Sequence, residues 1–270
     1  MVRMMIGRDL EDFFIPPTEK SRKGRFHVTG LKTKTYPDRE ITFEARRGEI
    51  LGFAGLIGAG RSEMAQAIFG VEKPLAGTVA LDDKNLRINS AKEAIRNGVY
   101  LVPEDRRKSG LVVDMSFREN VTMPRLNKYA TAAIISKKRE EAAAKKQSQS
   151  LAIKITSIEM PVGNLSGGNQ QKVVLAKWLA IDPKVIIFDE PTRGIDVGSK
   201  SEIYHLMRSL SERGVIVIMI SSDMEEILGV SDRIAVMHEG TITGILDRSE
   251  ADEETVMRLA VGTKLERQTG

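Results

Sequence analysis

A glycine-rich turn near residue 58 has the composition of a phosphate-binding loop. It follows the apolar residues 50–54, precedes the helix-like residues 62–69, and reads Gly55-Leu56-Ile57-Gly58-Ala59-Gly60-Arg61-Ser62. Glycines let the backbone curl so that successive N–H groups point at phosphate oxygens, and a following helix adds the positive end of its dipole. The spacing is that of a nucleotide-binding loop, except that Arg61 stands where lysine is expected. We expect the phosphates of a nucleotide to bind at Gly55, Gly58, Ala59, Gly60, Arg61, Ser62 and Glu63.

Two adjacent carboxylates end a second apolar stretch. Asp189 and Glu190 follow residues 185–188, which read Val-Ile-Ile-Phe and predict a buried strand. Ligands of open α/β sheets bind at the carboxyl ends of the strands, so these carboxylates are expected beside the glycine-rich turn. Hydroxyl and carboxylate oxygens suit Mg²⁺, and we expect Ser62 and Asp189 to hold this ion, with Glu190 next to the terminal phosphate.

A third motif precedes a helix-like segment that runs to Ala180, and it reads Leu165-Ser166-Gly167-Gly168-Asn169. Taken singly, Ser-Gly-Gly is an ordinary loop, and an apolar run before two acids fits any buried strand. In this order and setting, however, the three strings resemble the Walker A, signature and Walker B motifs of ATP-binding-cassette (ABC) ATPases. The resemblance implies a P-loop NTPase fold of the α/β class, with a parallel-sheet core, an antiparallel β subdomain and an inserted helical subdomain.

The resemblance also implies roles for single residues. In this family two cassettes face head to tail and hold ATP between the P-loop of one and the signature of the other. Leu165 to Asn169 would then contact the partner's ATP, and Glu190 would polarise the attacking water. Gly194-Ile195-Asp196 resembles the D-loop that touches the partner, although alone it fits a surface turn. Tyr36 is placed to stack on adenine, but Tyr36-Pro37-Asp38 is also an ordinary turn.

The sequence departs from the family pattern at three positions. Arg61 replaces the P-loop lysine, and its planar fork does not fit a lysine's compact pocket without displacing the phosphate. Glu104 stands in place of the Q-loop glutamine, where a carboxylate still suits a metal ion but adds negative charge near the phosphates. Ser222 stands where the family has its switch histidine.

These departures predict an ABC-type ATPase whose own P-loop site is slow or inactive, while its signature completes the site of a partner cassette. Loss of a group that contacts the transferring phosphoryl lowers the rate by about 10² to 10⁴. Two alternatives stay open. One is a module that binds nucleotide without hydrolysing it, and the other, less favoured, is a non-transport ABC ATPase acting on ribosomes or DNA.

Two longer strings resemble one subgroup of this family. The first is Pro103-Glu104-Asp105-Arg106-Arg107-Lys108-Ser109-Gly110-Leu111, and the second is Asp189-Glu190-Pro191-Thr192-Arg193-Gly194-Ile195-Asp196-Val197-Gly198. With the P-loop and signature strings, they are similar to the second, C-terminal cassette of bacterial sugar importers of the ribose, galactose and arabinose type. The resemblance implies a second cassette fused N-terminally (or a homodimer), membrane permease subunits, and indirectly a periplasmic sugar-binding protein. It also implies ATP and Mg²⁺ as cofactors and a cytoplasmic position, peripheral on the inner face of the membrane.

The composition fits this picture. The chain has 270 residues, of which 41% are hydrophobic, enough for a substantial core. Its charges nearly balance, with 41 Lys and Arg against 37 Asp and Glu, so the net charge of +4 gives no reason to expect nucleic acid as a partner. The absence of cysteine excludes disulfides and cysteine-based metal sites. No apolar run approaches the roughly 20 residues that span a bilayer.

The order of the predicted elements gives a domain map. We expect residues 1–24 to be a linker from a preceding cassette, residues 25–262 to form the ATP-binding domain, and residues 263–270 to be a polar tail. Antiparallel strands are predicted over 26–31 and 40–45, and a helical subdomain over about 106–165, helical from 116 to 160. Strands and helices that alternate over 184–237 predict a parallel sheet with right-handed crossovers, followed by a hairpin at 238–240 and a last helix at 253–261.

Overall fold

The computed structural model describes residues 23–263, and this part of the chain divides into two compact units. The first unit comprises residues 23–101, 184–190 and 197–263, and the second comprises residues 102–183 and 191–196. In the sequence, the second unit is therefore inserted into the first. The chain enters the second unit once more, for the six residues after Glu190. Nearly all of the predicted linker and tail lies outside the described residues.

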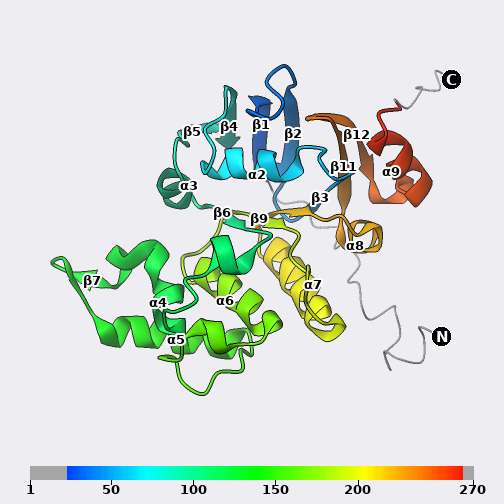
Figure 1. The fold of residues 1–270 in the computed structure, drawn as a ribbon. Coiled ribbons are helices and arrows are strands. Elements are labelled where there is room, and N and C mark those ends of the chain that lie inside the picture. Colours follow the sequence, from blue (N-terminus) through cyan, green and yellow to red (C-terminus); the bar gives the residue numbers. More distant parts are fainter. Residues whose placement is uncertain (1–22, 264–270) are drawn as a thin grey trace, which may run out of the picture. The chain divides into compact units, whose positions relative to one another are not determined.

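The core of the first unit is a six-stranded sheet with the P-loop strand inside it (Figure 1). In spatial order its strands are β12 (Thr241–Asp247), β11 (Arg233–His238), β3 (Ile50–Gly55), β10 (Ile216–Ile220), β9 (Val185–Asp189) and β6 (Val99–Val102). β3 pairs in parallel with β10 and β11, and β10 pairs in parallel with β9. The predicted parallel sheet over 184–237 is confirmed, and so is the hairpin that adds β12 antiparallel to β11.

Parallel strands covered on both faces need apolar side chains at every position, and these strands have them. All five residues of β9 and all five of β10 are buried. The helices that connect or flank the strands in this unit are α2 (Arg61–Phe69), α3 (Ala91–Asn97), α7 (Val197–Glu212), α8 (Met224–Val230) and α9 (Glu253–Ala260). The predicted helices at 62–69 and 253–261 are thus confirmed to within one residue.

A second, antiparallel sheet belongs to the same unit. Its order is β2-β1-β4-β5, formed by β1 (Arg25–Lys32), β2 (Ile41–Arg46), β4 (Ala76–Leu81) and β5 (Lys84–Leu86). Alternate residues of β1 and β2 are buried, which is the period expected for a sheet with one covered face. Asp82 and Asp83 connect β4 to β5 with φ of 49° and 62°, as a tight two-residue hairpin turn requires.

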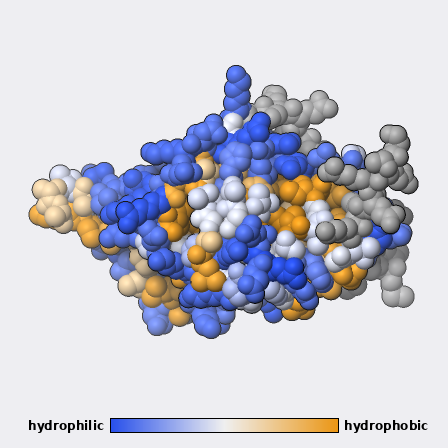
Figure 2. All heavy atoms as spheres, turned by 90° about the horizontal axis from the view of Figure 1, so that it is seen from above, coloured by the Kyte–Doolittle hydropathy of each residue, from blue (hydrophilic) through white to orange (hydrophobic). Residues whose placement is uncertain are grey.

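The second unit is mainly helical, as expected, but its middle contains a small hairpin. Its regular elements are η2 (Arg106–Gly110), α4 (Phe117–Thr122), η3 (Met123–Tyr129), β7 (Ala130–Thr131), β8 (Ile134–Ile135), α5 (Lys137–Ser150), η4 (Val162–Asn164) and α6 (Gly167–Leu179). The prediction of helix throughout 116–160 is wrong at β7 and β8, because Ala132 and Ala133 take positive φ and reverse the chain. It is wrong also over 151–160, where α5 has ended and the chain forms turns and bends. Figure 2 shows hydrophobic side chains at this end of the unit, where Ile134 is 75% exposed.

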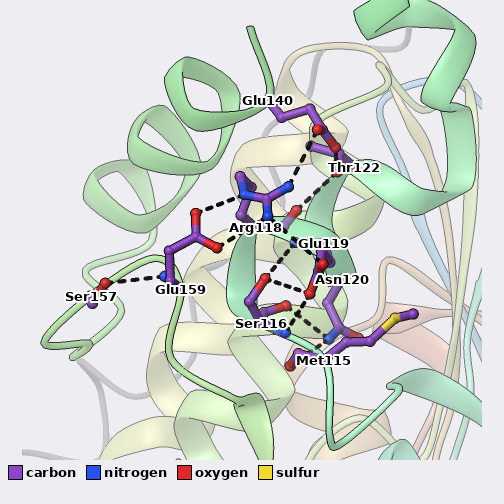
Figure 3. A network of polar contacts seen from close by, with 9 residues as sticks. All are labelled: Met115, Ser116, Arg118, Glu119, Asn120, Thr122, Glu140, Ser157 and Glu159. Carbon is purple, nitrogen blue, oxygen red and sulfur yellow. Dashed lines mark hydrogen bonds and ion pairs between the residues drawn. The ribbon is translucent and has the colours of Figure 1, made fainter. Parts of the chain in front are cut away.

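A polar network fixes the segment that leads to the signature (Figure 3). Arg118 donates from Nε and Nη2 to the two carboxylate oxygens of Glu159, at 2.8 and 3.0 Å, and from Nη1 to Glu140 at 3.3 Å. Backbone bonds join the same two segments, since the N–H groups of Phe117 and Arg118 donate to the carbonyls of Met160 and Ile158. Two parallel bonds to one carboxylate hold orientation as well as distance, so the chain enters the signature from a fixed point.

Candidate nucleotide-binding site

The glycine-rich turn joins β3 to α2 and leaves the amino end of that helix open. Gly60 is the N-cap with φ of 96°, and it has no side chain to satisfy the N–H groups of the first turn. A Cβ added at Gly60 would lie 3.2 Å from the Tyr36 ring, whereas one at Gly58 would meet nothing within 4 Å. The Ala59 N–H of this turn donates to the Leu56 carbonyl at 3.0 Å, so the donors left for an anion are those at the start of α2, where no side chain caps the helix.

Ser62 and Asp189 lie together beside this cradle, as predicted. The Ser62 hydroxyl donates to Oδ1 of Asp189 at 3.1 Å, although the two residues are 127 positions apart. Burial raises the pKa of Asp189 to about 6, while the bond from Ser62 acts in the opposite direction. A buried carboxylate and a hydroxyl are hard oxygen donors, and Mg²⁺ takes one or two such protein ligands together with phosphates and water. These residues fit a magnesium ion, and no larger cluster of ligand side chains occurs among residues 23–263.

The raised pKa of Asp189 predicts a pH-dependent stability in the absence of ligand. The folded protein holds this proton more tightly than the unfolded chain, so the stabilisation is full at acidic pH and is lost as the pH rises through about 6. We expect Asp189→Asn to remove roughly 1–2 kcal/mol of this pH dependence between pH 5 and 7.5. Urea unfolding of both proteins at the two pH values measures the free energy of unfolding. The same change with pH in both proteins would contradict the raised pKa of Asp189.

Glu190 occupies a strained backbone position next to Asp189. Its φ is 47°, in the left-handed region that residues other than glycine rarely adopt, and its N–H donates to the Ile220 carbonyl at 2.9 Å. Such strain is maintained only where the surroundings fix it, and it is common at functional sites. The Ser222 hydroxyl donates to Oε2 of Glu190 at 3.1 Å, so the two residues predicted to lie near the terminal phosphate do lie together.

The Arg61 side chain is directed into the protein. Its exposed fraction is only 8%, its Nη1 donates to the Ser221 carbonyl at 2.5 Å, and its Nη2 lies 4.0 Å from Oε1 of Glu190. Burial lowers the pKa of Arg61, and the nearby charges of Glu190, Asp189 and Glu63 raise it again. The contact with phosphate predicted for this side chain stays a prediction, because here its donors are directed at protein groups.

Tyr36 lies against the P-loop. Its hydroxyl donates to the Gly58 carbonyl, and its ring borders Gly60 and Gly240 so closely that a Cβ at Gly240 would be 2.3 Å from it. Ala59, by contrast, is buried under the loop, where its carbonyl accepts from the N–H of Gly240 at 2.9 Å. The ring is thus next to the phosphate cradle, and adenine stacking by Tyr36 remains a prediction.

The signature residues belong to the second unit, where Ser166 begins α6. The Ser166 hydroxyl accepts from the N–H of Asn169 at 3.4 Å and from its side-chain amide at 3.0 Å. Ser166 itself is exposed, whereas Gly168 behind it is buried. An open groove of about 330 Å³ lies beside this tip, with Lys154, Leu165 and Asn169 among its lining residues. The tip therefore faces solvent with a free helix end, as a surface that binds an anion from another molecule would.

The second unit gives Arg106 contacts that the sequence did not predict. The basic run that begins at Arg106 is typical of a solvated face, but the Arg106 guanidinium donates to the carbonyls of Arg193 and Gly194, at 3.0 and 3.4 Å. A Cβ on Gly167 would lie 2.8 Å from Arg106, so this one side chain borders both the signature and the turn before Asp196. The family resemblance of the string 103–111 pointed to Arg106 and Arg107 only as the place where such cassettes meet their membrane partner. Glu104 forms an ion pair with Arg193 in this unit, and its metal-binding role remains a prediction.

Comparison with known proteins decides the family. Residues 39–193, more than half of the 270-residue chain, match the model of the family described as ABC transporter. The chain belongs to the ABC transporter family. The cassette is 51% identical over 262 residues to the ribose import ATP-binding protein RbsA of Lactococcus lactis subsp. lactis, covering 97% of the cassette and 53% of that protein. It is 48% identical over 264 residues to a putative ribose/galactose/methyl galactoside import ATP-binding protein of Rhizobium etli, covering 50% of it. The cassette spans about half the length of these curated relatives.

Solved structures establish the fold. The ATP-binding cassette MJ1267 in its ADP conformation superposes with a TM-score of 0.73 at 20% identity, covering 89% of this cassette and 100% of that chain. The cassette MJ0796, solved as a dimer in a post-hydrolysis state bound to ADP and Pi, gives a TM-score of 0.68 at 22% identity, with 83% and 98% covered. The predicted fold class, a P-loop NTPase cassette with mixed sheets and an inserted helical part, is confirmed. None of the helices in residues 23–263 has the length and apolar character that crossing a bilayer requires.

Proposed function

We propose that this cassette is the ATP-binding, energy-coupling part of a carbohydrate importer. One observation carries the proposal: Ser62, Asp189 and Glu190 converge beside an open P-loop. An open cradle of backbone donors binds the phosphates of a nucleotide, and the adjacent oxygens suit its metal ion. The names of the ribose and galactose import relatives support a pentose or hexose as the imported substrate class.

The partners follow from the same comparisons. The import relatives are about twice the length of this chain, which supports a second cassette, fused N-terminally in one polypeptide or supplied as a second copy. MJ0796, which has the same fold, was solved as a dimer bound to ADP and Pi, and this is compatible with our proposal that two cassettes act together. We propose attachment to permease subunits at the cytoplasmic face of the membrane, with a periplasmic sugar-binding protein delivering the substrate. No nucleic acid takes part.

In the site at this chain's P-loop, which we call its own site, Ser62 and Asp189 would hold Mg²⁺. The ion would neutralise charge on the phosphates. The N–H groups at the start of α2 orient the phosphates, and Glu190 accepts a hydrogen bond from the attacking water. Ser222 in place of an imidazole provides a hydroxyl that already donates to Glu190. We propose that this P-loop site is slow, and the contacts of Arg61 and Ser222 with Glu190 support the proposal.

The signature serves a different site. Ser166 and the N–H groups that follow it form an exposed helix terminus, which suits the γ-phosphate of an ATP held by a partner cassette. The groove beside Ser166 gives room for the rest of that nucleotide. Arg106 contacts both the signature side and the Gly194 turn, so it holds the two partner-facing segments in one arrangement. Hydrolysis in the assembled transporter is asymmetric, with the partner's P-loop site the faster one.

A non-hydrolysing nucleotide-binding module is the second candidate, favoured by the contact of Arg61 with Glu190. The two functions differ in the effect of Glu190→Gln on ATP hydrolysis by the purified chain. Slow hydrolysis that disappears with this change identifies an ATPase, and a background rate that does not respond identifies the binding module.

Nucleotide binding itself is tested by titration calorimetry with ATP and Mg²⁺. We expect weak but saturable heat, and a dissociation constant that increases by about tenfold or more in Asp189→Asn, since that change removes the charged metal ligand. Ser90→Ala, which removes an N-cap hydroxyl on α3, is the control and should bind as the unchanged chain does. Absence of heat at millimolar ATP would exclude the proposed nucleotide site.

A further inference from the structure

We propose that Arg61 is a positioning residue that clamps Glu190 and thereby holds the own site of this cassette in its slow state. The inference rests on the proposed function for its kinetic consequence, and on geometry alone for the clamp. It assigns Arg61 a protein partner in place of the phosphate contact that its sequence position suggests.

The first step is the direction of the side chain. Arg61 begins α2 directly after the left-handed Gly60, so its backbone belongs to the phosphate cradle. Its guanidinium, however, is 8% exposed and donates to the Ser221 carbonyl at 2.5 Å. A buried guanidinium needs hydrogen-bond acceptors and a compensating negative charge. Ser221 provides the acceptor, and Glu190 provides the charge at 4.0 Å.

The second step is the rigidity of the acceptor. The Ser221 hydroxyl donates to Oε2 of Glu226 at 2.8 Å, and Glu226 is 2% exposed. The other oxygen of Glu226 accepts from the Tyr204 hydroxyl at 2.6 Å and from Nζ of Lys200 at 2.9 Å. Tyr204 and Lys200 lie on α7, so Ser221 is held by a buried network from a second element. Arg61 is thus anchored to a carbonyl that is itself fixed.

The third step is the state of Glu190. Its Oε1 faces Arg61 and its Oε2 accepts from the Ser222 hydroxyl at 3.1 Å, so both oxygens face donors of the protein. A carboxylate polarises water best when one of its oxygens is free to accept a hydrogen bond from that water. The clamp therefore lowers the rate of this P-loop site without closing the cradle, because no side chain caps the start of α2 and an added Cβ at Gly58 meets no atom within 4 Å.

A double-mutant cycle tests the clamp without any nucleotide. The variants are Arg61→Met, Glu190→Gln and the combination, each compared by urea unfolding. We expect the unfolding equilibrium constant of the double variant to deviate from the product of the single effects by about tenfold, because removing one partner alone leaves the other charge buried. The pair Arg61→Met and Asp232→Asn is the control, because Asp232 precedes β11 and bonds to Arg208 and Ile50 instead. This control pair should be additive, and additivity in the Arg61–Glu190 cycle would overturn the clamp.

Arg61→Lys tests the kinetic consequence. A lysine keeps one positive charge but lacks the fork that donates to the Ser221 carbonyl, so Glu190 is released. We expect kcat for ATP hydrolysis by the purified chain to rise about tenfold or more, with KM changed by less than about threefold. The gain should vanish in Arg61→Lys combined with Glu190→Gln. An unchanged kcat, or a gain that survives Glu190→Gln, would overturn the positioning role.

The double-mutant cycle and the calorimetric titration with ATP together separate this inference from the proposed function. A coupled cycle in a chain that produces no heat with ATP supports the clamp and rejects the nucleotide site. An additive cycle in a chain that binds ATP rejects the clamp and leaves the nucleotide site standing. If Arg61→Met does not fold, Arg61→Gln takes its place in the cycle, because its amide can still donate to Ser221 while the charge is removed.

Discussion

Exchange of Ser166 for alanine is expected to lower ATP hydrolysis by a partner cassette about 10²- to 10³-fold. This is the loss of rate typical when one hydrogen-bond donor to the reacting group is removed. The measurement is kcat of an assembly in which this chain is paired with a cassette that carries the P-loop lysine. Binding of ATP to the cassette's own P-loop should stay unchanged, because the Ser166 hydroxyl bonds to Asn169 and not to a residue of the P-loop.

Ser166 also caps a helix, so a structural control is needed. Its hydroxyl accepts from the N–H of Asn169, and its loss costs about 1 kcal/mol of stability. Ser90 caps α3 through the N–H of Glu93 in the same way, so Ser90→Ala has the same stability cost at a helix with no proposed role. We expect equal losses of stability in the two variants and loss of partner hydrolysis in Ser166→Ala only. Equal kinetic effects in both would mean that the signature acts only through helix stability.

Gly58→Asp is expected to weaken ATP binding by about 10²- to 10³-fold. The new carboxylate has open space, since a Cβ at Gly58 meets no atom within 4 Å. It puts a negative charge at the turn that we propose binds the phosphates. At a partly exposed site, two unit charges about 4 Å apart repel by roughly 4 kcal/mol. Titration calorimetry measures the dissociation constant, and near-ultraviolet circular dichroism checks the fold.

Two matched variants separate charge from backbone strain. Gly58→Asn has nearly the same shape without the charge, and we expect it to weaken binding by less than about tenfold. Gly30→Asp introduces the same residue at another positive-φ glycine, φ 60°, where an added Cβ meets only Oε2 of Glu40, at 3.9 Å, and it should leave binding unchanged. Equal weakening by Gly58→Asp and Gly58→Asn would mean that backbone conformation, and not phosphate charge, controls this site.

The sequence predicted most of the first unit because its signals are local. Alternating burial in β1 and β2, continuous apolar runs in β9 and β10, and glycine stops at Gly70 and Gly98 can each be read within a few residues. The sequence also predicted that Ser62 and Asp189 lie close to each other. Parallel strands with helical crossovers bring their carboxyl ends to one edge, so two loops far apart in sequence meet there.

The hairpin of β7 and β8 was not predictable in the same way. Residues 130–135 contain no glycine, proline or asparagine, and the turn is made by Ala132 and Ala133 at positive φ. Alanine gives no turn signal and is the best helix former, so local propensity favoured the helix that the structure does not contain.

The sequence by itself determined that a glycine-rich turn before a helix, a pair of carboxylates and an exposed helix start are present, because each depends on residues that are neighbours in the chain. Only the tertiary structure decided where the long cationic side chains go. Arg61 reaches Ser221 and Glu190, and Arg106 reaches Gly194, across separations of at least 88 residues. A guanidinium can extend toward phosphate or fold back to a carbonyl, and which of these it does depends on acceptors that the fold, and not the local sequence, provides.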